Sequence, residues 1–279
     1  MSWLDAIILG IIEGITEFLP VSSTGHLTIA EKLMGYSIND PSITAFTAII
    51  QIGAILAAVL YFWTDIRRVA MSWVSGIFKK SARQDKNYKF GWAIILGSLP
   101  IAIVGLAFQD IIETTLRSMW WVAAGLFLWS FVLLWSDRLP KKTRSESDVT
   151  WRDTLFIGLM QCVALIPGVS RSGATIAAGL MAGFDRLSAT RLSFFLGIPA
   201  LAAAGLLQAV TKFDDIGSGT IGWGPTIFAT IISFAVGYLT IAWLIKFISQ
   251  NDFRLFVWYR IALSAAIISL LLTGTIGAV

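Results

Sequence analysis

Reactive polar side chains interrupt this strongly apolar chain near its N-terminus. Glu13 and Glu17 are spaced i, i+4, which places both carboxylates on one face of a helical arm. Two carboxylates facing lipid would be costly, so we predict that both face a polar interior and function there. Ser23 and His26 follow three residues apart and can share a helix face as a nucleophile and its base. The alternative for His26, the only histidine, is a packed and hydrogen-bonded residue.

A break separates the two glutamates from this serine and histidine. Pro20 stops the first arm, and Ser22, Ser23 and Thr24 are suited to the N-cap of a second arm. An N-terminus of this kind exposes backbone N–H groups and the positive end of a helix dipole. The break is therefore predicted to bind phosphate.

A second break contains an arginine. The run from Pro167 to Thr175 places the guanidinium of Arg171 among small and hydroxyl-bearing residues, and bidentate oxyanion binding is typical of arginine. The alternative is an internal ion pair of Arg171 with Glu13 or Glu17, which need not exclude phosphate binding. The other predicted phosphate-binding residues of this run are Ser170, Ser172 and Thr175.

Together these residues could perform phosphoryl transfer. Our hypothesis is that Ser23 attacks phosphorus, His26 takes its proton and Glu17 orients His26, while Arg171 binds phosphate oxygens. Glu13 would assist Glu17, through a metal in one version. A histidine nucleophile, or a water positioned by Ser23, would use the same residues. A site of this kind suits a substrate whose tail lies in lipid.

The composition is that of a polytopic membrane protein. The 279 residues are 56% hydrophobic and only 14% charged, and the mean hydropathy is +0.77. The net charge of +4 does not indicate nucleic-acid binding, because the basic residues lie between apolar segments. The one cysteine, Cys162, excludes an internal disulfide, and no basic n-region of a signal peptide precedes Lys32.

The apolar segments divide into six full crossings and two shorter, broken regions. The broken regions, 3–36 and 153–184, are each predicted to form a re-entrant hairpin of two short arms, although the first arm could instead be a full span. The predicted crossings are residues 43–63, 91–110, 119–136, 190–210, 222–245 and 256–276.

The distribution of charge sets a topology. Loops 64–90 and 137–153 are rich in Lys and Arg and lie on one side by parity, so that side is predicted to be cytoplasmic and both termini outside. The same side is predicted to carry Arg186, Arg191, Lys246, Arg254 and Arg260. The opposite side has only Lys32, Arg117 and Lys212 as basic residues.

The two broken regions resemble each other at an offset of 148 residues, so that Glu13 corresponds to Gln161. Each half, approximately 1–140 and 150–279, then has one hairpin and three crossings, and the odd number of crossings inverts the second half. We therefore predict an all-α polytopic membrane protein, a single domain over 1–279, built from inverted-topology repeats. The two hairpin tips are expected to meet inside the membrane.

The run from Glu13 to His26, with the run from Pro167 to Thr175, resembles the bacterial undecaprenyl pyrophosphate phosphatases, the bacitracin-resistance family. The resemblance extends over essentially the whole chain, without departure from either motif, and includes Phe46 to Leu60 with Gln51, and Gly237-Tyr238.

That resemblance implies hydrolysis of undecaprenyl pyrophosphate to undecaprenyl phosphate and inorganic phosphate, which recycles the lipid carrier of peptidoglycan precursors. It implies a plasma-membrane location, a reaction centre facing the outer leaflet, and a divalent cation, Mg²⁺ or Ca²⁺, with Glu13 and Glu17 as candidate ligands. By position it implies functional roles for Glu13, Glu17, Ser23, His26, Ser170, Arg171 and Thr175.

A transporter is the main alternative function. Inverted repeats with polar breaks also fit a lipid or anion transporter, or a flippase. The pairing of a nucleophile with a base at Ser23 and His26 favours an enzyme, because a carrier does not need it. The sequence leaves open whether the chain is a homo-oligomer.

Overall fold

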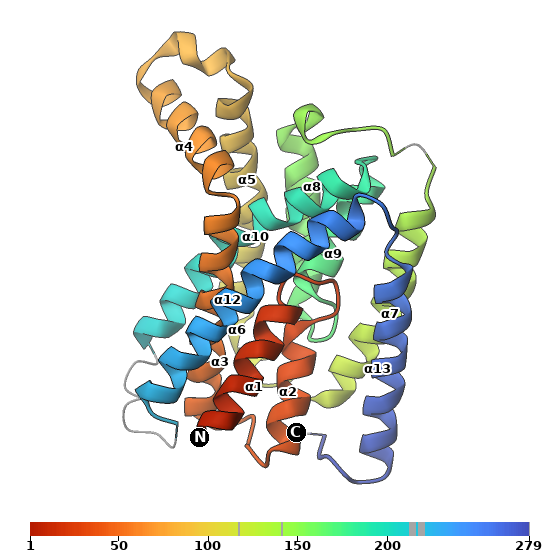
Figure 1. Cartoon of the computed structure of the whole chain (residues 1–279). Helices are drawn as coiled ribbons and strands as arrows, with labels where there is room; N and C mark the ends of the chain where they lie inside the picture. Colours follow the sequence, from red (N-terminus) through yellow and green to blue (C-terminus); the bar gives the residue numbers. More distant parts are fainter. Residues whose placement is uncertain (117, 141, 212–215, 217–220, 279) are drawn as a thin grey trace.

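The computed structural model describes residues 1–116, 118–140, 142–211, 216 and 221–278, and this part of the chain is helical (Figure 1). Arg117 and Lys212, used in the charge argument, lie outside it. The α-helices are α1 Trp3–Thr16, α2 Ser23–Leu33, α3 Pro41–Tyr61, α4 Trp63–Phe78, α5 Lys86–Ala107, α6 Gln109–Glu113, α7 Met119–Arg138, α8 Trp151–Gln161, α9 Arg171–Met181, α10 Arg186–Thr211, α12 Trp223–Ile248 and α13 Arg254–Leu272. Within the described residues, three short 3₁₀ turns lie at Lys80–Gln84, Glu146–Asp148 and Cys162–Leu165.

Six of these helices are long and apolar enough to cross a membrane. They are α3, α5, α7, α10, α12 and α13, with 19 to 26 residues each. At 1.5 Å per residue they span roughly 30 Å or more, the thickness of the hydrocarbon core. Each coincides with a predicted crossing, with ends that differ by a few residues. The prediction of a multi-pass, all-helical membrane protein is confirmed.

The two predicted hairpins are also present. The first consists of α1 and α2, and the second of α8 and α9, with arms of 14, 11, 11 and 11 residues. A 14-residue helix is about 21 Å long, which is too short for a full crossing. This length favours the re-entrant form of the first arm over the alternative in which it spans the membrane.

The basic loop 64–90 is more ordered than the sequence suggested. It contains α4, whose apolar side chains Met71, Val74 and Phe78 are exposed. Arg67 and Arg68 lie in the same helix, and these two charges interrupt the apolar period by which an amphipathic helix is recognised in a sequence. With the start of α5, α4 forms a protrusion beyond the other helices (Figure 1).

Ion pairs gather the basic segments at one end of the molecule. Arg186 at the start of α10 pairs with Asp137 at the end of α7 (Nε–Oδ1 2.7 Å). Arg191 pairs with Asp65 of α4 at 2.7 Å and with Glu146 at 2.5 Å. Both chain ends lie at the opposite end (Figure 1). The basic segments that were predicted to share a side thus lie at the same end of the molecule.

Arg260 is the exception to that charge assignment. It was expected on the basic surface, but it lies within α13 and is fully buried. The sequence position near the start of a span suggested an interfacial residue, whereas its guanidinium bonds to backbone carbonyls of other elements.

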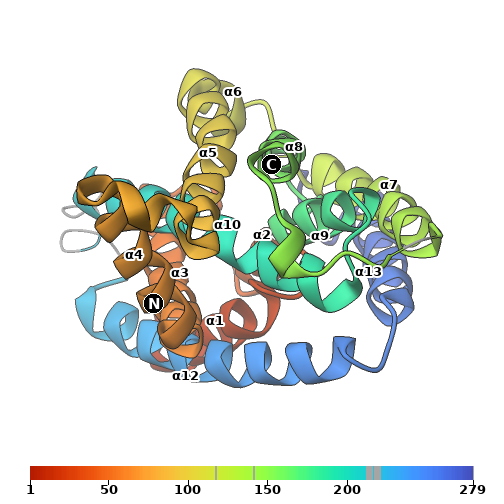
Figure 2. The same cartoon turned by 90° about the horizontal axis from the view of Figure 1, so that it is seen from above.

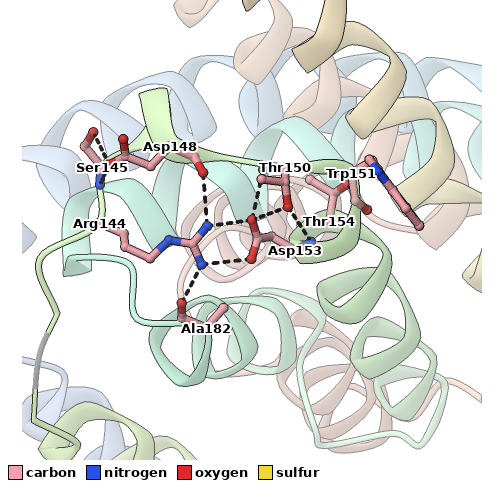
Figure 3. Close-up of polar contacts among 8 residues, drawn as sticks. All are labelled: Arg144, Ser145, Asp148, Thr150, Trp151, Asp153, Thr154 and Ala182. Carbon is pink, nitrogen blue, oxygen red and sulfur yellow. Dashed lines mark hydrogen bonds and ion pairs between the residues drawn. The ribbon is translucent and has the colours of Figure 1, made fainter.

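Arg144 closes the second hairpin at its open end (Figure 3). Its guanidinium donates to both oxygens of Asp153 at the start of α8 (2.8 and 2.6 Å) and to the carbonyl of Ala182 just after α9 (2.8 Å). It also lies over the ring of Phe184, 4.3 Å from the centroid. One side chain thus fixes the separation of the two arms.

The first arm of each hairpin packs closely on a long helix from the other half of the chain. In α1, a Cβ on Gly10 would lie 2.6 Å from the carbonyl oxygen of Ala229 in α12, so only glycine permits this approach. In α8, Gly158, at the corresponding position 148 residues later, meets Gly97 of α5 backbone to backbone. Figure 2 shows α12 running beside α1 along one edge of the molecule.

Candidate active site

The two hairpin breaks have the same local structure. Ser22 and Ser170 both have positive φ, 73° and 74°, which a residue with a side chain seldom adopts. Each is the N-cap of its second arm, and its Oγ accepts a hydrogen bond from the N–H three residues on, Gly25 (3.3 Å) or Gly173 (3.2 Å). Strain at two matched positions indicates a required geometry. The predicted capping of α2 is confirmed, with Ser22 as the cap.

Direct bonds join the two breaks. Ser172 Oγ in the second donates to the carbonyl of Leu19 in the first at 2.8 Å. Arg260 of α13 donates to the carbonyl of Pro20 at 2.9 Å and to that of Gly168 at 3.0 Å. The expectation that the hairpin tips touch is confirmed by these contacts.

Glu17 is at the centre of the polar cluster. It is 5% exposed and sits just after the end of α1. Its Oε2 accepts from Ser23 Oγ at 2.7 Å and from Gln51 Nε2 of α3 at 3.3 Å. Its Oε1 accepts from Arg171 Nη2 at 3.2 Å. A carboxylate in this position can take a proton from the Ser23 hydroxyl and is itself stabilised by the guanidinium.

Arg171 brings the second hairpin into this cluster. Its side chain is 9% exposed, and Nη1 donates to the carbonyl of Ser193 in α10 at 3.2 Å. Its Nε is buried without a hydrogen-bond partner. The ion pair weighed from the sequence is present, with Glu17 as the partner, and a donor remains on the guanidinium for a further acceptor.

His26 lies elsewhere than the sequence hypothesis placed it. Its Nδ1 is 2.7 Å from the carbonyl oxygen of Ser22, and its Nε2 is 2.6 Å from the hydroxyl of Tyr259 in α13. The expected hydrogen bonds from Ser23 to His26 and from His26 to Glu17 are not formed, and Ser23 bonds to Glu17 instead. Three residues along α2 turn the imidazole toward α13, away from Glu17.

A cavity of about 220 Å³ opens beside Ser23. Its lining includes Glu13, Ser23, Thr24, Glu31 and Gln51. Glu13 is 1% exposed, and its Oε1 has no hydrogen-bond partner. A buried carboxylate oxygen of this kind needs a cation, a proton or a donor from a ligand.

Most of the hydroxyls that were predicted to bind phosphate form hydrogen bonds within the protein. Ser22 and Ser170 cap helices, Ser172 joins the two breaks, and Thr175 Oγ1 is 2.7 Å from Ser193 Oγ. Of the predicted hydroxyls, Ser23 and Thr24 line the cavity.

Several residues of the site carried no role in the sequence analysis. Gln51 was noted only within a resembling segment, Tyr259 was not singled out, and Arg260 was assigned to the basic side of the molecule. Polar residues inside a predicted crossing are the signal that could have identified Gln51. Nothing in the sequence spacing indicates that α13 returns to the first hairpin.

The arrangement has the parts of a phosphoryl-transfer site. It contains a hydroxyl paired with a buried carboxylate, a guanidinium, and the N-terminal ends of α2 and α9, whose first N–H groups have no partner within the helix. Among the described residues, no group of three or more His, Cys, Asp or Glu side chains forms a ready-made metal cage.

Comparison with known proteins places the chain in a known family. Residues 6–266 match the family model described as bacitracin resistance protein BacA. A relative from Frankia casuarinae named undecaprenyl-diphosphatase 3 is 57% identical over the whole of both chains, and an undecaprenyl-diphosphatase from Cutibacterium acnes is 56% identical over the whole of both. One from Micrococcus luteus is 46% identical, again over both whole chains. The chain belongs to the BacA bacitracin-resistance family.

Proposed function

We propose that the two hairpin breaks bind the diphosphate head group of undecaprenyl pyrophosphate and that Ser23 attacks its terminal phosphorus. The protein is an undecaprenyl-diphosphatase, which hydrolyses this lipid to undecaprenyl phosphate and inorganic phosphate and supports bacitracin resistance. The observation that carries the site assignment is the 2.7 Å bond from Ser23 to Glu17, which is itself paired with Arg171.

The first step transfers one proton and exchanges one P–O bond. Ser23 Oγ bonds to the terminal phosphorus, its proton passes to Glu17 Oε2, and the bridging oxygen leaves with undecaprenyl phosphate. In the second step, water attacks the phosphorus of the phosphoserine and the P–Oγ bond breaks. Ser23 Oγ takes back the proton held by Glu17, and the proton released by the water leaves with inorganic phosphate. We assign the base role to Glu17 rather than His26 because Glu17 is the group bonded to the Ser23 hydroxyl.

The remaining groups stabilise negative charge. Arg171, with an unpartnered Nε, offers a donor to the oxygens of the transferring phosphoryl group. The N-terminal ends of α2 and α9 add backbone N–H groups and the positive ends of two helix dipoles. The two breaks thus act from opposite sides on one anion.

Glu13 fits a divalent cation better than Glu17 does. Glu13 Oε1 is buried without a partner, whereas both oxygens of Glu17 are already bonded. Carboxylate and hydroxyl oxygens are suited to Mg²⁺ or Ca²⁺, and Mg²⁺ is commonly bound by one or two carboxylates together with substrate phosphates. When bound, such an ion would neutralise part of the diphosphate charge.

The architecture proposed for this chemistry is an inverted repeat. Its support is the matched φ of Ser22 and Ser170 and the matched close packing of Gly10 and Gly158, 148 residues apart. The basic end of the molecule is cytoplasmic in this proposal, and the cavity faces the outer leaflet with both termini. The polyprenyl tail remains in the bilayer.

Release of phosphate from undecaprenyl pyrophosphate in detergent tests the function. Wild type is expected to turn over, and Ser23→Ala to lose activity, while Ser37→Ala in the loop after α2 serves as a control. A phosphoenzyme labelled from the terminal phosphate is expected on Ser23. Label on His26 would overturn the nucleophile assignment. Lipid flux through vesicles without phosphate release, in wild type and Ser23→Ala alike, would instead support the transporter.

A further inference from the structure

The bonding of His26 determines which ring nitrogen carries its proton. A carbonyl oxygen only accepts, so the 2.7 Å contact with Ser22 requires a hydrogen on Nδ1. In the neutral ring, Nε2 is then unprotonated and accepts from the hydroxyl of Tyr259, 2.6 Å away. The two rings lie parallel, with an interplanar angle of 1°. Both nitrogens are thus occupied, and neither contacts Ser23.

The next residue of α13 bonds to the same break. Arg260 is fully buried and donates from Nη1 to the carbonyl of Pro20 at 2.9 Å. The rest of its guanidinium bonds to the carbonyls of Gly125 (3.2 Å) and Gly168 (3.0 Å) and to Ser130 Oγ (3.2 Å). Arg260 therefore connects Pro20, in the first half of the break, to α7 and to the second hairpin.

The bond from Arg260 to Pro20 and the bond from His26 to Ser22 hold the chain at and just before the strained residue Ser22, which directly precedes Ser23. Arg260 holds the carbonyl of Pro20, and Tyr259, through His26 Nδ1, holds the carbonyl of Ser22, which also accepts from the backbone N–H of His26 at 3.3 Å. Between them the chain adopts φ of 73° at Ser22, and the next side chain is the hydroxyl aimed at Glu17. A backbone conformation this unfavourable persists only when its surroundings over-determine it.

We infer that Tyr259 is a positioning residue for Ser23, acting through His26, and that His26 serves as a link between Tyr259 and the break rather than as the acceptor of the Ser23 proton. This inference rests on the proposed function, in which Glu17 takes that proton. It assigns roles to Tyr259 and Arg260 in α13 and changes the role of the only histidine.

The first test is spectroscopic and independent of activity. Because the chain has a single histidine, imidazole labelled with ¹⁵N gives signals from His26 alone. In detergent-solubilised wild type at neutral pH, we expect Nδ1 protonated and Nε2 unprotonated and hydrogen-bonded. Tyr259→Phe is expected to shift the Nε2 signal, whereas the matched Tyr88→Phe, in the α4–α5 protrusion, leaves it unchanged. The opposite tautomer, or no response to Tyr259→Phe, would overturn the inference.

The second test uses isosteres of the imidazole. The side-chain amide nitrogen of Asn can occupy the position of Nδ1, and that of Gln the position of Nε2. His26→Asn therefore keeps a hydrogen-bond donor for the carbonyl of Ser22 but has no nitrogen that titrates. Loss of one hydrogen bond that holds the reactive geometry is expected to lower a rate constant by about tenfold. Tyr259→Phe and His26→Asn should therefore each lower kcat by about that factor. The double variant should be no worse than either single variant, since both break the same link.

These outcomes separate the inference from the proposed function. If His26→Asn is as inactive as Ser23→Ala and loses the acidic limb of the pH–rate profile, His26 is an acid–base group and the positioning role is wrong. If Ser23→Ala retains full activity, the proposed catalytic mechanism fails, while the ¹⁵N signals still report whether Tyr259 fixes His26.

Discussion

At the scale of single residues, Glu17 is the group on which most of the site depends. It accepts hydrogen bonds from Ser23, Gln51 and Arg171, which come from three different elements. Glu17→Gln preserves size but removes the charge and the basic oxygen. We expect kcat to fall by roughly 10²–10⁴-fold, the usual range for loss of a general base, with a smaller change in KM. Steady-state phosphate release measures this.

A change of less than tenfold in that variant would contradict the base assignment. Asp5→Asn is a suitable control. Asp5 lies in the first turn of α1, at the end away from Glu17, and accepts a hydrogen bond from Tyr36 outside the polar cluster around Glu17. It should leave kcat unchanged.

Arg171→Lys tests the guanidinium. A lysine keeps the charge, but its donors all radiate from one nitrogen, whereas Arg171 reaches the Ser193 carbonyl from Nη1 and Glu17 from Nη2 with Nε still free of a partner. We expect kcat/KM to fall by roughly 10²–10³-fold, the cost commonly seen for a lost transition-state donor. Near wild-type kcat/KM in Arg171→Lys, measured on the same lipid substrate, would mean that charge alone suffices.

The residue types of the site could be predicted from the sequence, but their pairing could not. Glu13, Glu17, Ser23 and Arg171 stand out because polar groups are rare in such an apolar chain. The partner of His26 could not be predicted, because Tyr259 lies 233 positions away and only tertiary packing brings α13 to the break. Spacing of i, i+3 indicates which side chains share a face, not which neighbour that face meets.

At the scale of elements, the matched breaks make a specific prediction about strain. Ser170 combines positive φ with a capping hydroxyl. Ser170→Gly loses the cap but removes the strain, whereas Ser170→Ala loses the cap and keeps the strain. We expect Ser170→Ala to be less stable than Ser170→Gly by about 1 kcal/mol. Thermal denaturation of both in one detergent checks this, and the reverse order would show that backbone strain is not important there.

The Arg144–Asp153 pair gives the second hairpin a dependence on pH. Burial raises the pKa of Asp153, but hydrogen bonds from Arg144 and Thr150 outweigh it, so the pKa lies below its usual value. The stabilisation is therefore present above the unfolded-state pKa of about 3.9 and lost as pH falls through the folded-state value. Because Arg144 is 34% exposed, we expect Asp153→Asn to cost only about 1 kcal/mol at pH 7.

The corresponding measurement is the melting temperature of both proteins between pH 7 and pH 3. The gap between wild type and Asp153→Asn should narrow toward the acidic end. A gap that is constant with pH would show that the carboxylate charge contributes nothing.

The lengths of the helices could be predicted from the sequence where a single pattern, such as apolar length or a Pro/Gly/Ser break, defines their ends. The six spans follow from apolar length, and the hairpin arms from Pro, Gly and Ser at each break. The helix α4 was missed because Arg67 and Arg68 interrupt its apolar pattern, so an amphipathic helix read as a basic loop.

At the scale of the molecule, the two halves exchange contacts. The first arm of each hairpin packs on a long helix of the other half, and Arg260 bonds to both breaks at once. A site assembled in this way requires both halves to be in place. This explains why each half of the sequence has an incomplete set of reactive groups, with the glutamates in one and the arginine in the other.

The proposed orientation makes the last prediction. In a Cys162→Ser background, which removes the only native thiol, single cysteines can be placed at two exposed positions, Lys80 and Thr273. Lys80 lies just after α4 in the protrusion, and Thr273 directly follows α13, which ends at the opposite end of the molecule (Figure 1). The positive-inside rule places Lys80 in the cytoplasm. A membrane-impermeant maleimide should therefore label Thr273→Cys in intact cells and label Lys80→Cys only after lysis. Labelling of Lys80→Cys in intact cells would reverse the topology and turn the cavity toward the cytoplasm, where a phosphatase of the outer leaflet could not meet its lipid.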